Sequence, residues 1–214
     1  MHNIMSLIHD KNPYEDFPYK NFELNKHGWG GNLPIFREFI DKYQPPVIIE
    51  VGSWLGQSTM NMATHIKNNG LNTKIIAIDT WLGGEEHWQV SKYKDMLKLH
   101  YGYPQLYYQF LANVMHTGVQ DIIVPFPVPS VIGARFLSQR GIKSNMIYID
   151  ASHAEIDVYM DLIHFQPLLT NSNWVMFGDD YEPGWQSVVD AVDKFGKETG
   201  LQVEDHNKVW VIRD

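Results

Sequence analysis

Five acidic side chains lie at or beside the ends of four short apolar runs in this sequence: Glu50, Asp79, Asp150, Asp179 and Asp180. Acids are common at such places as turn formers and helix caps, so each one alone has a structural explanation. The carboxyl ends of parallel strands open onto one crevice, and the five acids are therefore expected to face a common cleft. Such a cleft suits proton transfer or divalent-cation chemistry.

Three of these acids form a candidate metal site. Asp150, Asp179 and Asp180 offer carboxylates in a chain without cysteine, which is the oxygen-rich ligand set that Mg²⁺ prefers. Adjacent like charges are costly unless a cation or a proton lies between them. The alternative is structural: Asp150 caps the helix that follows it, and Asp179 and Asp180 form a solvated turn.

A candidate general base follows three residues after Asp150. His153 would stand at the same cleft, and the ordinary pKa of a histidine, about 6.5, suits proton transfer near neutrality. Asp150 competes for this role, because the free oxygen of a metal ligand can accept a proton. His153 is equally consistent with a helix-start residue that donates one hydrogen bond. His87, His100 and His164 have no comparable context and are interpreted as surface or core residues.

The segment EVGSWLGQST, from Glu50 to Thr59, is typical of a strand-to-helix turn around a ligand. Gly52 permits a tight turn, and Gly56 permits close approach of the next helix. The spacing is not that of a dinucleotide fingerprint or a P-loop, which argues against a nicotinamide dehydrogenase. Asp79, at the end of the next run, can accept hydrogen bonds from both hydroxyls of a ribose. Trp81 either covers an adenine or is simply buried.

The elements that must position these residues alternate between strands and helices. This order predicts an α/β, doubly wound, mostly parallel seven-stranded sheet with a C-terminal antiparallel hairpin. The predicted strands span 47–51, 74–78, 122–124, 146–150 and 174–178, and the hairpin pairs 201–204 with 209–212. The predicted helices span 32–43, with Asn32 as cap, 57–67, 130–139, 155–169 and 184–199.

Residues 1–31 are expected to form an N-terminal arm that ends in a glycine-rich loop from Gly28 to Gly31. Residues 32–214 are expected to form one domain with an aromatic helical insertion at about 82–118. The insertion is where an acceptor pocket or a lid would lie, although its many tyrosines also suit a core or a dimer surface. The glycine-rich loop is a candidate second lid.

Four motifs together resemble the class I S-adenosylmethionine-dependent methyltransferases, in particular metal-dependent small-molecule and sugar O-methyltransferases. The motifs are EVGSWLGQST, AIDTW, YIDASH and GDDYEPGWQSVVDAVDKF. The sequence departs from the commonest pattern at Trp54, which stands in place of a glycine, and at Ala151, which follows the acid of the fourth strand.

The resemblance implies a Rossmann-like fold and assigns roles to individual residues. It implies a cofactor site formed by Glu50, Gly52, Ser53, Gly56, Ser58, Asp79, Thr80, Trp81, Ser130 and Asp150. It implies Asp150, Asp179 and Asp180 as ligands of Mg²⁺ or another divalent cation. Asp150 and His153 are the candidate catalytic residues from their position at the cleft. S-adenosylmethionine as methyl donor and Mg²⁺ at the acceptor hydroxyl then predict O-methylation of a small-molecule acceptor, with a sugar hydroxyl as one candidate.

Two other functions remain open at this stage. One is a metal-independent methyltransferase with another acceptor, and the other is a catalytically inactive binding or assembly module of the same fold. The Asn-Pro-Pro-aromatic tetrad typical of enzymes that methylate amino groups of nucleic-acid bases is absent. Asp179-Asp180-Tyr181-Glu182 stands at that place, which disfavours a nucleic-acid methyltransferase.

The amino-acid composition disfavours several classes of binding partner. The net charge of −8, from 17 basic and 25 acidic residues, disfavours nucleic acid. No apolar run is long enough to span a membrane and no secretory signal is evident, so we expect a cytoplasmic protein without a membrane partner. The absence of cysteine excludes disulfides, thiolate zinc sites and a cysteine nucleophile. A homo-oligomer is compatible with the sequence, which identifies neither the acceptor nor the oligomeric state.

Overall fold

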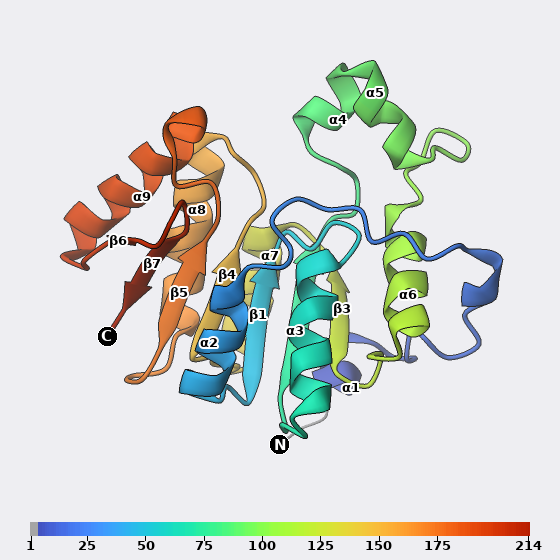
Figure 1. Ribbon diagram of the computed structural model, residues 1–214, viewed down its shortest axis with the longest axis horizontal. Helices are drawn as coiled ribbons and strands as arrows, with labels where there is room; N and C mark the ends of the chain where they lie inside the picture. The colour runs from blue at the N-terminus through green and yellow to red at the C-terminus, as the bar shows by residue number, and fades with distance from the viewer. Residues whose placement is uncertain (1–3) are drawn as a thin grey trace.

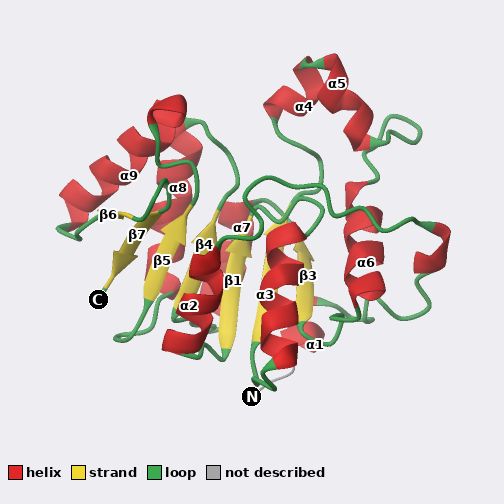
Figure 2. Cartoon of the chain, in the orientation of Figure 1, coloured by secondary structure: helices red, strands yellow, loops and turns green. Residues whose placement is uncertain are grey.

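A seven-stranded sheet with the strand order β3-β2-β1-β4-β5-β7-β6 organises the chain. The computed structural model describes residues 4–214. Strands β1 to β5 are parallel, while β7 pairs antiparallel with β5 and with β6 (Figure 2). The strands are β1 (Val47–Val51), β2 (Lys74–Asp79), β3 (Ile123–Pro127), β4 (Met146–Ile149), β5 (Val175–Gly178), β6 (Glu204–Asp205) and β7 (Trp210–Arg213). The predicted fold class is confirmed.

Helices cover both faces of this sheet (Figure 1). One core joins the sheet to α2, α3 and α6, and the other joins it to α1, α7, α8 and α9. The α-helices are α1 (Ile4–Ile8), α2 (Pro34–Tyr43), α3 (Gln57–Asn68), α4 (Glu85–Gln89), α5 (Ser91–Lys94), α6 (Leu106–Thr117), α7 (Ser130–Gln139), α8 (Glu155–Phe165) and α9 (Gln186–Thr199). The 3₁₀-helices are η1 (Tyr19–Asn21), η2 (Asp95–Leu97), η3 (Gln166–Leu168) and η4 (Pro183–Trp185).

The continuous apolar run of β1 follows from its central place in the sheet. All five of its residues are buried, because helices cover the strand on both sides. Ile48 belongs to the core with α2 and α3, whereas Val47 and Ile49 belong to the opposite core. Strand alternation therefore places Glu50 on the α3 side of the sheet.

Several predicted boundaries differ from the structure; among them, helix α8 ends at Phe165 and not at 169, and α9 begins at Gln186 and not at 184. Strand β3 continues to Pro127 instead of ending at Val124, and it is an edge strand, where proline costs no ladder hydrogen bond to a second neighbour. Helix α2 begins at Pro34 with Leu33 as its cap, so Asn32 is not the capping residue. The final hairpin is shorter than predicted, because β6 contains only two residues.

The predicted arm packs on the domain and contains a short helix. Ile4 of α1 is buried in the core on the α7 and α8 side, and the His9 ring nitrogen Nε2 lies 2.6 Å from the Pro125 carbonyl oxygen. Tyr14 is buried in the opposite core. The first three residues of the arm lie outside the described residues. The arm therefore packs against both faces of the sheet, through Ile4 on one side and Tyr14 on the other.

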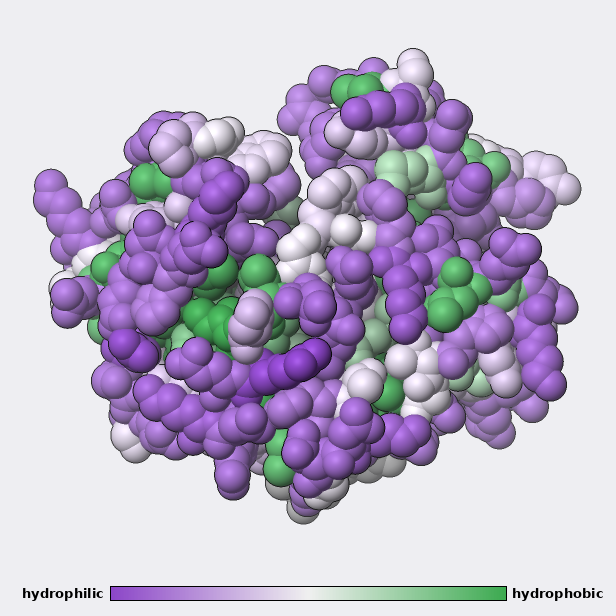
Figure 3. All heavy atoms as spheres, viewed as in Figure 1, coloured by the Kyte–Doolittle hydropathy of each residue, from purple (hydrophilic) through white to green (hydrophobic). Residues whose placement is uncertain are grey.

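The insertion supplies α4, α5 and η2, which project beyond the sheet (Figure 1), and α6, which packs beside α3. In the space-filling view, a notch separates the α4–α5 projection from the α9 side of the molecule (Figure 3). The carboxyl ends of the parallel strands point toward this side of the molecule (Figure 2). Within residues 4–214, no helix is long and apolar enough to cross a membrane.

Candidate cofactor and metal site

Glu50 is a fully buried carboxyl at the end of β1. It accepts hydrogen bonds from the hydroxyls of Ser53 (2.9 Å), Ser58 (2.5 Å) and Thr59. Burial raises the pKa of Glu50 to about 7, although the three hydroxyl donors act in the opposite direction. The turn after β1 is therefore built around this one side chain, and Ser53 and Ser58 serve it directly.

The two predicted glycines of this turn both have left-handed backbones, with φ of 87° at Gly52 and 89° at Gly56. A Cβ on Gly52 would lie 1.9 Å from the Asp150 carbonyl oxygen, and one on Gly56 would lie 2.9 Å from the Phe110 ring. Only glycine fits both the conformation and the space. Gly52 thus allows the ends of β1 and β4 to approach each other.

Asp79, at the end of β2, is held by the main chain of two loops. Its carboxylate accepts hydrogen bonds from the amides of Trp54 (2.8 Å) and Trp81 (2.7 Å). Burial raises the pKa of Asp79, against the effect of these amides. Each carboxylate oxygen has two lone pairs, so the side chain retains acceptor capacity for a ligand.

The two residues after Asp79 have mainly structural contacts. Trp81 is 1% exposed, its indole donates to the Trp54 carbonyl oxygen at 2.7 Å, and its ring packs on Phe110. No face of this ring is open to a ligand in the described conformation. The Thr80 hydroxyl accepts a hydrogen bond from the Leu82 amide at 3.2 Å.

Asp150 follows β4 directly and lies among like charges. Burial and the charge of Asp179 raise its pKa to about 7. The Tyr148 hydroxyl donates to the Asp150 carboxylate at 2.9 Å and partly offsets these effects. The carboxylate is accordingly short of positive or hydrogen-bonding partners, in contrast to Glu50.

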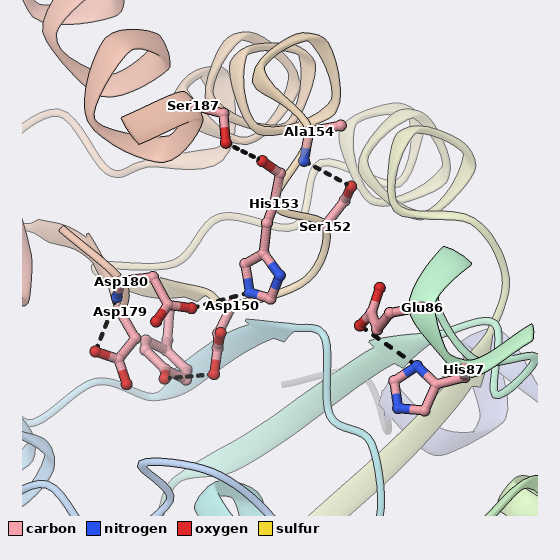
Figure 4. Close-up of polar contacts among 10 residues, drawn as sticks. Glu86, His87, Asp150, Ser152, His153, Ala154, Asp179, Asp180 and Ser187 are labelled. Carbon is pink, nitrogen blue, oxygen red and sulfur yellow. Dashed lines mark hydrogen bonds and ion pairs between the residues drawn. The ribbon is translucent and has the colours of Figure 1, made fainter. Parts of the chain in front are cut away.

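His153 joins the loop after β4 to the loop after β5 (Figure 4). Its Nε2 lies 2.9 Å from Asp180 Oδ2, and this contact raises the pKa of His153. Its ring stacks on Trp185 with centroids 4.1 Å apart, and its carbonyl oxygen accepts a hydrogen bond from Ser187 at 2.5 Å. The residues after β5 and at the start of α9 therefore fix the position of this histidine.

Among the described residues, one group of side chains is spaced to hold a metal ion. One ligand atom from each of Asp150, His153 and Asp180 lies within 4.8 Å of the other two. The predicted set differs from it in one member, because Asp179 takes no part and His153 does. Asp179 Oδ1 accepts the amide of Asp180 at 2.9 Å, and its Oδ2 lies beside Gly30 of the arm (Figure 4).

Ser130 begins α7 but faces another partner. Its hydroxyl hydrogen-bonds the carboxyl of Asp161 on α8, which is 4% exposed and whose pKa burial raises to about 6. The predicted contact of Ser130 with an adenine therefore competes with this bond.

Five further residues around this edge were not among the predicted site residues: Trp29, Trp54, Glu86, His87 and Trp185. Trp54 and His87 stack with centroids 4.4 Å apart, and Trp29 lies over both. His87 is buried, as one of its two interpretations held, while Glu86 beside it acts electrostatically on His153 from the insertion (Figure 4). Trp185 covers His153. These contacts join segments far apart in the chain, so local spacing contains no signal for them.

The open parallel sheet, the turn around Glu50 and the acid at the end of β2 form the arrangement at which doubly wound α/β proteins bind their ligands. The sequence profile of the family described as methyltransferase domain matches residues 49–181. The chain therefore belongs to the methyltransferase-domain family. The expected methyltransferase is confirmed. A comparison with curated protein sequences gives no significant match.

Solved structures share this fold at low sequence identity. The O-methyltransferase NovP has a TM-score of 0.63 at 11% identity, covering 86% of this chain and 79% of that one. CalS11, a TDP-rhamnose 3′-O-methyltransferase of calicheamicin biosynthesis, has a TM-score of 0.56 at 16% identity, with 84% and 76% covered. An O-methyltransferase from Bacillus cereus in complex with S-adenosylhomocysteine (SAH) has a TM-score of 0.58 at 12% identity, with 99% and 97% covered. These identities establish similarity of fold only.

Proposed function

We propose that this protein transfers a methyl group from S-adenosylmethionine to a hydroxyl of a small molecule with the help of a bound divalent cation, Mg²⁺ in the first instance. The observation that carries the proposal is the convergence of Asp150, His153 and Asp180 at the ends of β4 and β5. This group lies beside the cofactor turn, because the backbones of Gly52 and Asp150 are in close approach.

The residues of the β1 and β2 ends fit the cofactor. The two glycines let the turn after β1 lie against Asp150 and Phe110, where a side chain would clash, and Asp79 at the neighbouring strand end can accept hydrogen bonds from ribose hydroxyls. We assign Glu50, Gly52, Ser53, Gly56, Ser58, Asp79 and Thr80 to the cofactor side, with Asp150 at its boundary. Trp81 and Ser130 act there only indirectly, through the core and through Asp161. The bound cofactor supplies an electrophilic methyl group on sulfur.

The residues of the β4 and β5 ends fit a cation. Asp150 has a raised pKa because buried negative charges lie together, and a cation would relieve this repulsion. We assign Asp150 and Asp180 as its ligands, with Asp179 as a third carboxylate beside them. A bound cation lowers the pKa of a coordinated hydroxyl. His153 is 28% exposed at its side chain and takes the proton of the acceptor hydroxyl, with Asp150 as the alternative base.

A sugar hydroxyl is the acceptor we propose to test first. The exposed rings of Trp185, beside His153, and of Trp88 and Tyr103, on the insertion, offer faces on which a sugar ring can pack. The similarity in fold to CalS11, a TDP-rhamnose methyltransferase, supports the same choice. Incubating the protein with S-adenosylmethionine, Mg²⁺ and a panel of nucleotide sugars and catechols, followed by mass spectrometry, tests it. In this scheme residues 32–214 form the catalytic domain, residues 1–31 an arm and residues 82–118 an acceptor-side insertion.

Calorimetric titration of S-adenosylmethionine, first with Mg²⁺ and then with EDTA, tests the proposed function. We expect micromolar binding that Asp79→Ala abolishes, and a separate Mg²⁺ signal that Asp150→Ala abolishes. Asp190→Asn is the matched control, because Asp190 is an exposed acid of α9 that only Gln186 contacts by hydrogen bond in the described residues.

Three outcomes would change the proposal. Absence of cofactor binding under every condition would overturn it. Methyl transfer that persists in EDTA would remove the cation and favour the metal-independent alternative. Cofactor binding without turnover on any acceptor, in wild type and Asp150→Ala alike, would favour the inactive binding module.

A further inference from the structure

Two ring nitrogens beside the cofactor turn are buried and have no hydrogen-bond partner among the described residues. They are Nε1 of Trp54 and Nε2 of His87. The His87 residue is 6% exposed, and the two rings are inclined by 32° at a centroid distance of 4.4 Å. Leaving a buried donor without a partner costs about 1–3 kcal/mol. Such a pair indicates a ligand that supplies the missing acceptors.

Trp54 Nε1 and His87 Nε2 are both hydrogen-bond donors when the His87 ring is neutral with its proton on Nε2. The amide of Gly84 donates to His87 Nδ1 at 3.1 Å, and Glu86 Oε1 lies 3.4 Å from the same nitrogen. A neutral ring that accepts the Gly84 amide at Nδ1 has its proton on Nε2. Burial lowers the pKa of His87 and favours this neutral form. Trp54 Nε1 can only donate. The missing ligand atoms are therefore acceptors.

An acceptor of hydrogen bonds lies next to these donors. Asp79 receives the main-chain amide of Trp54 at 2.8 Å, and its charge acts on the His87 ring. A ligand hydroxyl can donate to a carboxylate and accept from an N–H at the same time. A carboxylate that contacts the Trp54 main chain and acts on the His87 ring, together with the two N–H donors of these rings, is thus complementary to a pair of neighbouring hydroxyls, such as those of a ribose.

A third ring shields this place from water. The Trp29 ring lies 5.8 Å from that of Trp54 and 6.1 Å from that of His87, and is itself 55% exposed. It stands between Gly28 and Gly30, and Gly30 has a φ of 63°. The neighbouring glycines give this ring freedom to move.

We propose that Trp54 Nε1 and His87 Nε2 donate hydrogen bonds to the two ribose hydroxyls of the cofactor, which Asp79 receives from the other side. This inference rests on the proposed cofactor dependence and adds three residues, including the covering Trp29, to which the predicted cofactor set gives no role. It makes the arm, the cofactor turn and the insertion parts of one ribose site.

Calorimetry with adenosine and with 2′,3′-dideoxyadenosine tests this inference, because the second probe lacks both hydroxyls. Wild-type protein should prefer adenosine. Trp54→Phe keeps a ring and removes one N–H, so it should weaken adenosine binding about five- to tenfold and leave dideoxyadenosine binding unchanged. His87→Phe should have the same effect and serves as the second variant if Trp54→Phe does not fold.

Tyr101→Phe is the matched control. Tyr101 belongs to the same insertion and is 97% exposed, so loss of its hydroxyl should leave the preference for adenosine intact. SAH is the reference ligand. Binding of SAH by all proteins with an unchanged preference in Trp54→Phe and His87→Phe would overturn this inference alone, including in favour of an acceptor subsite at these rings. Failure of wild type to bind SAH would overturn it together with the proposed function.

Discussion

The acids at the strand ends fall into two groups that differ in their hydrogen-bond partners. One group lies at the ends of β1 and β2, and the other at the ends of β4 and β5. Three hydroxyls donate to Glu50 and loop amides donate to Asp79, so both carboxyls have partners from the chain itself. Asp150 has one tyrosine hydroxyl and stands among the charges of Asp179 and Asp180. The acids of the first region thus have hydrogen-bond donors from the chain, whereas the second region sets three carboxylates against one histidine and suits a cation.

The two regions meet at Gly52, and Gly52→Ala should break both. The new Cβ would meet the Asp150 carbonyl oxygen and would require a left-handed alanine. We expect a loss of at least about 3 kcal/mol in the free energy of unfolding, measured by urea titration. Gly70→Ala is the control, because Gly70 also has a positive φ but no atom within 4 Å of the added Cβ, and should cost only about 1 kcal/mol. Equal effects of the two substitutions would contradict the close approach.

The first region can be tested through the pH dependence of Glu50. Its pKa rises from 4.5 to about 7 on folding, so the folded state holds the proton more tightly than the unfolded chain. The stability linked to this proton is present at low pH and is lost as pH rises through about 7. Glu50→Gln removes that loss, and its free energy of unfolding relative to wild type should increase by about 2–3 kcal/mol between pH 5 and pH 8.

Urea titrations at the two pH values measure this difference. Glu38→Gln, at an exposed position on α2, should show no comparable change. A pH-independent difference between Glu50→Gln and wild type would mean that the hydroxyls keep Glu50 ionised in the folded protein, and the contrast between the two regions would then disappear.

The smallest expected effect concerns Ser130, outside both regions. Its bond to Asp161 favours the charged form of a carboxyl whose pKa is about 6. Ser130→Ala should therefore cost about 1 kcal/mol of unfolding free energy at pH 8 and less at pH 5, where Asp161 is protonated. SAH affinity should change less than about twofold. Ser138→Ala, an exposed position on the same helix, is the control, and a large loss of SAH affinity in Ser130→Ala alone would restore the adenine contact.

The positions of the strand-end acids and of Gly52 could be predicted from the sequence. The acids of the strand ends were found because buried runs are short and visible, and the carboxyl ends of parallel strands meet at one edge. Gly52 was found for the same reason, as the residue directly after β1. The order of strands and helices sufficed for the fold class.

Features that depend on the direction of a turn or on contacts between distant segments could not be predicted from the sequence. Asp179 and Asp180 are neighbours, yet the left-handed backbone of Asp180, with φ of 63°, sends the two carboxyls to different partners. His87 belongs to a helix of five residues, too short to show a period. Proline at 125 and 127 hid the end of β3, since only its place at the sheet edge makes these residues acceptable.

The attachment of the arm has a consequence for the order of assembly during synthesis. Gln109, Asn113 and His116 of α6 form hydrogen bonds to the arm main chain at Glu23, Asn25 and Phe22. Asn113 also donates to the Leu55 carbonyl oxygen in the cofactor turn. The arm leaves the ribosome before α6, because its hydrogen-bond partners on α6 follow it by about 90 residues. The arm can therefore dock only after α6 has been synthesised. A nascent chain stalled before α6 would expose the glycine turn with nothing across it.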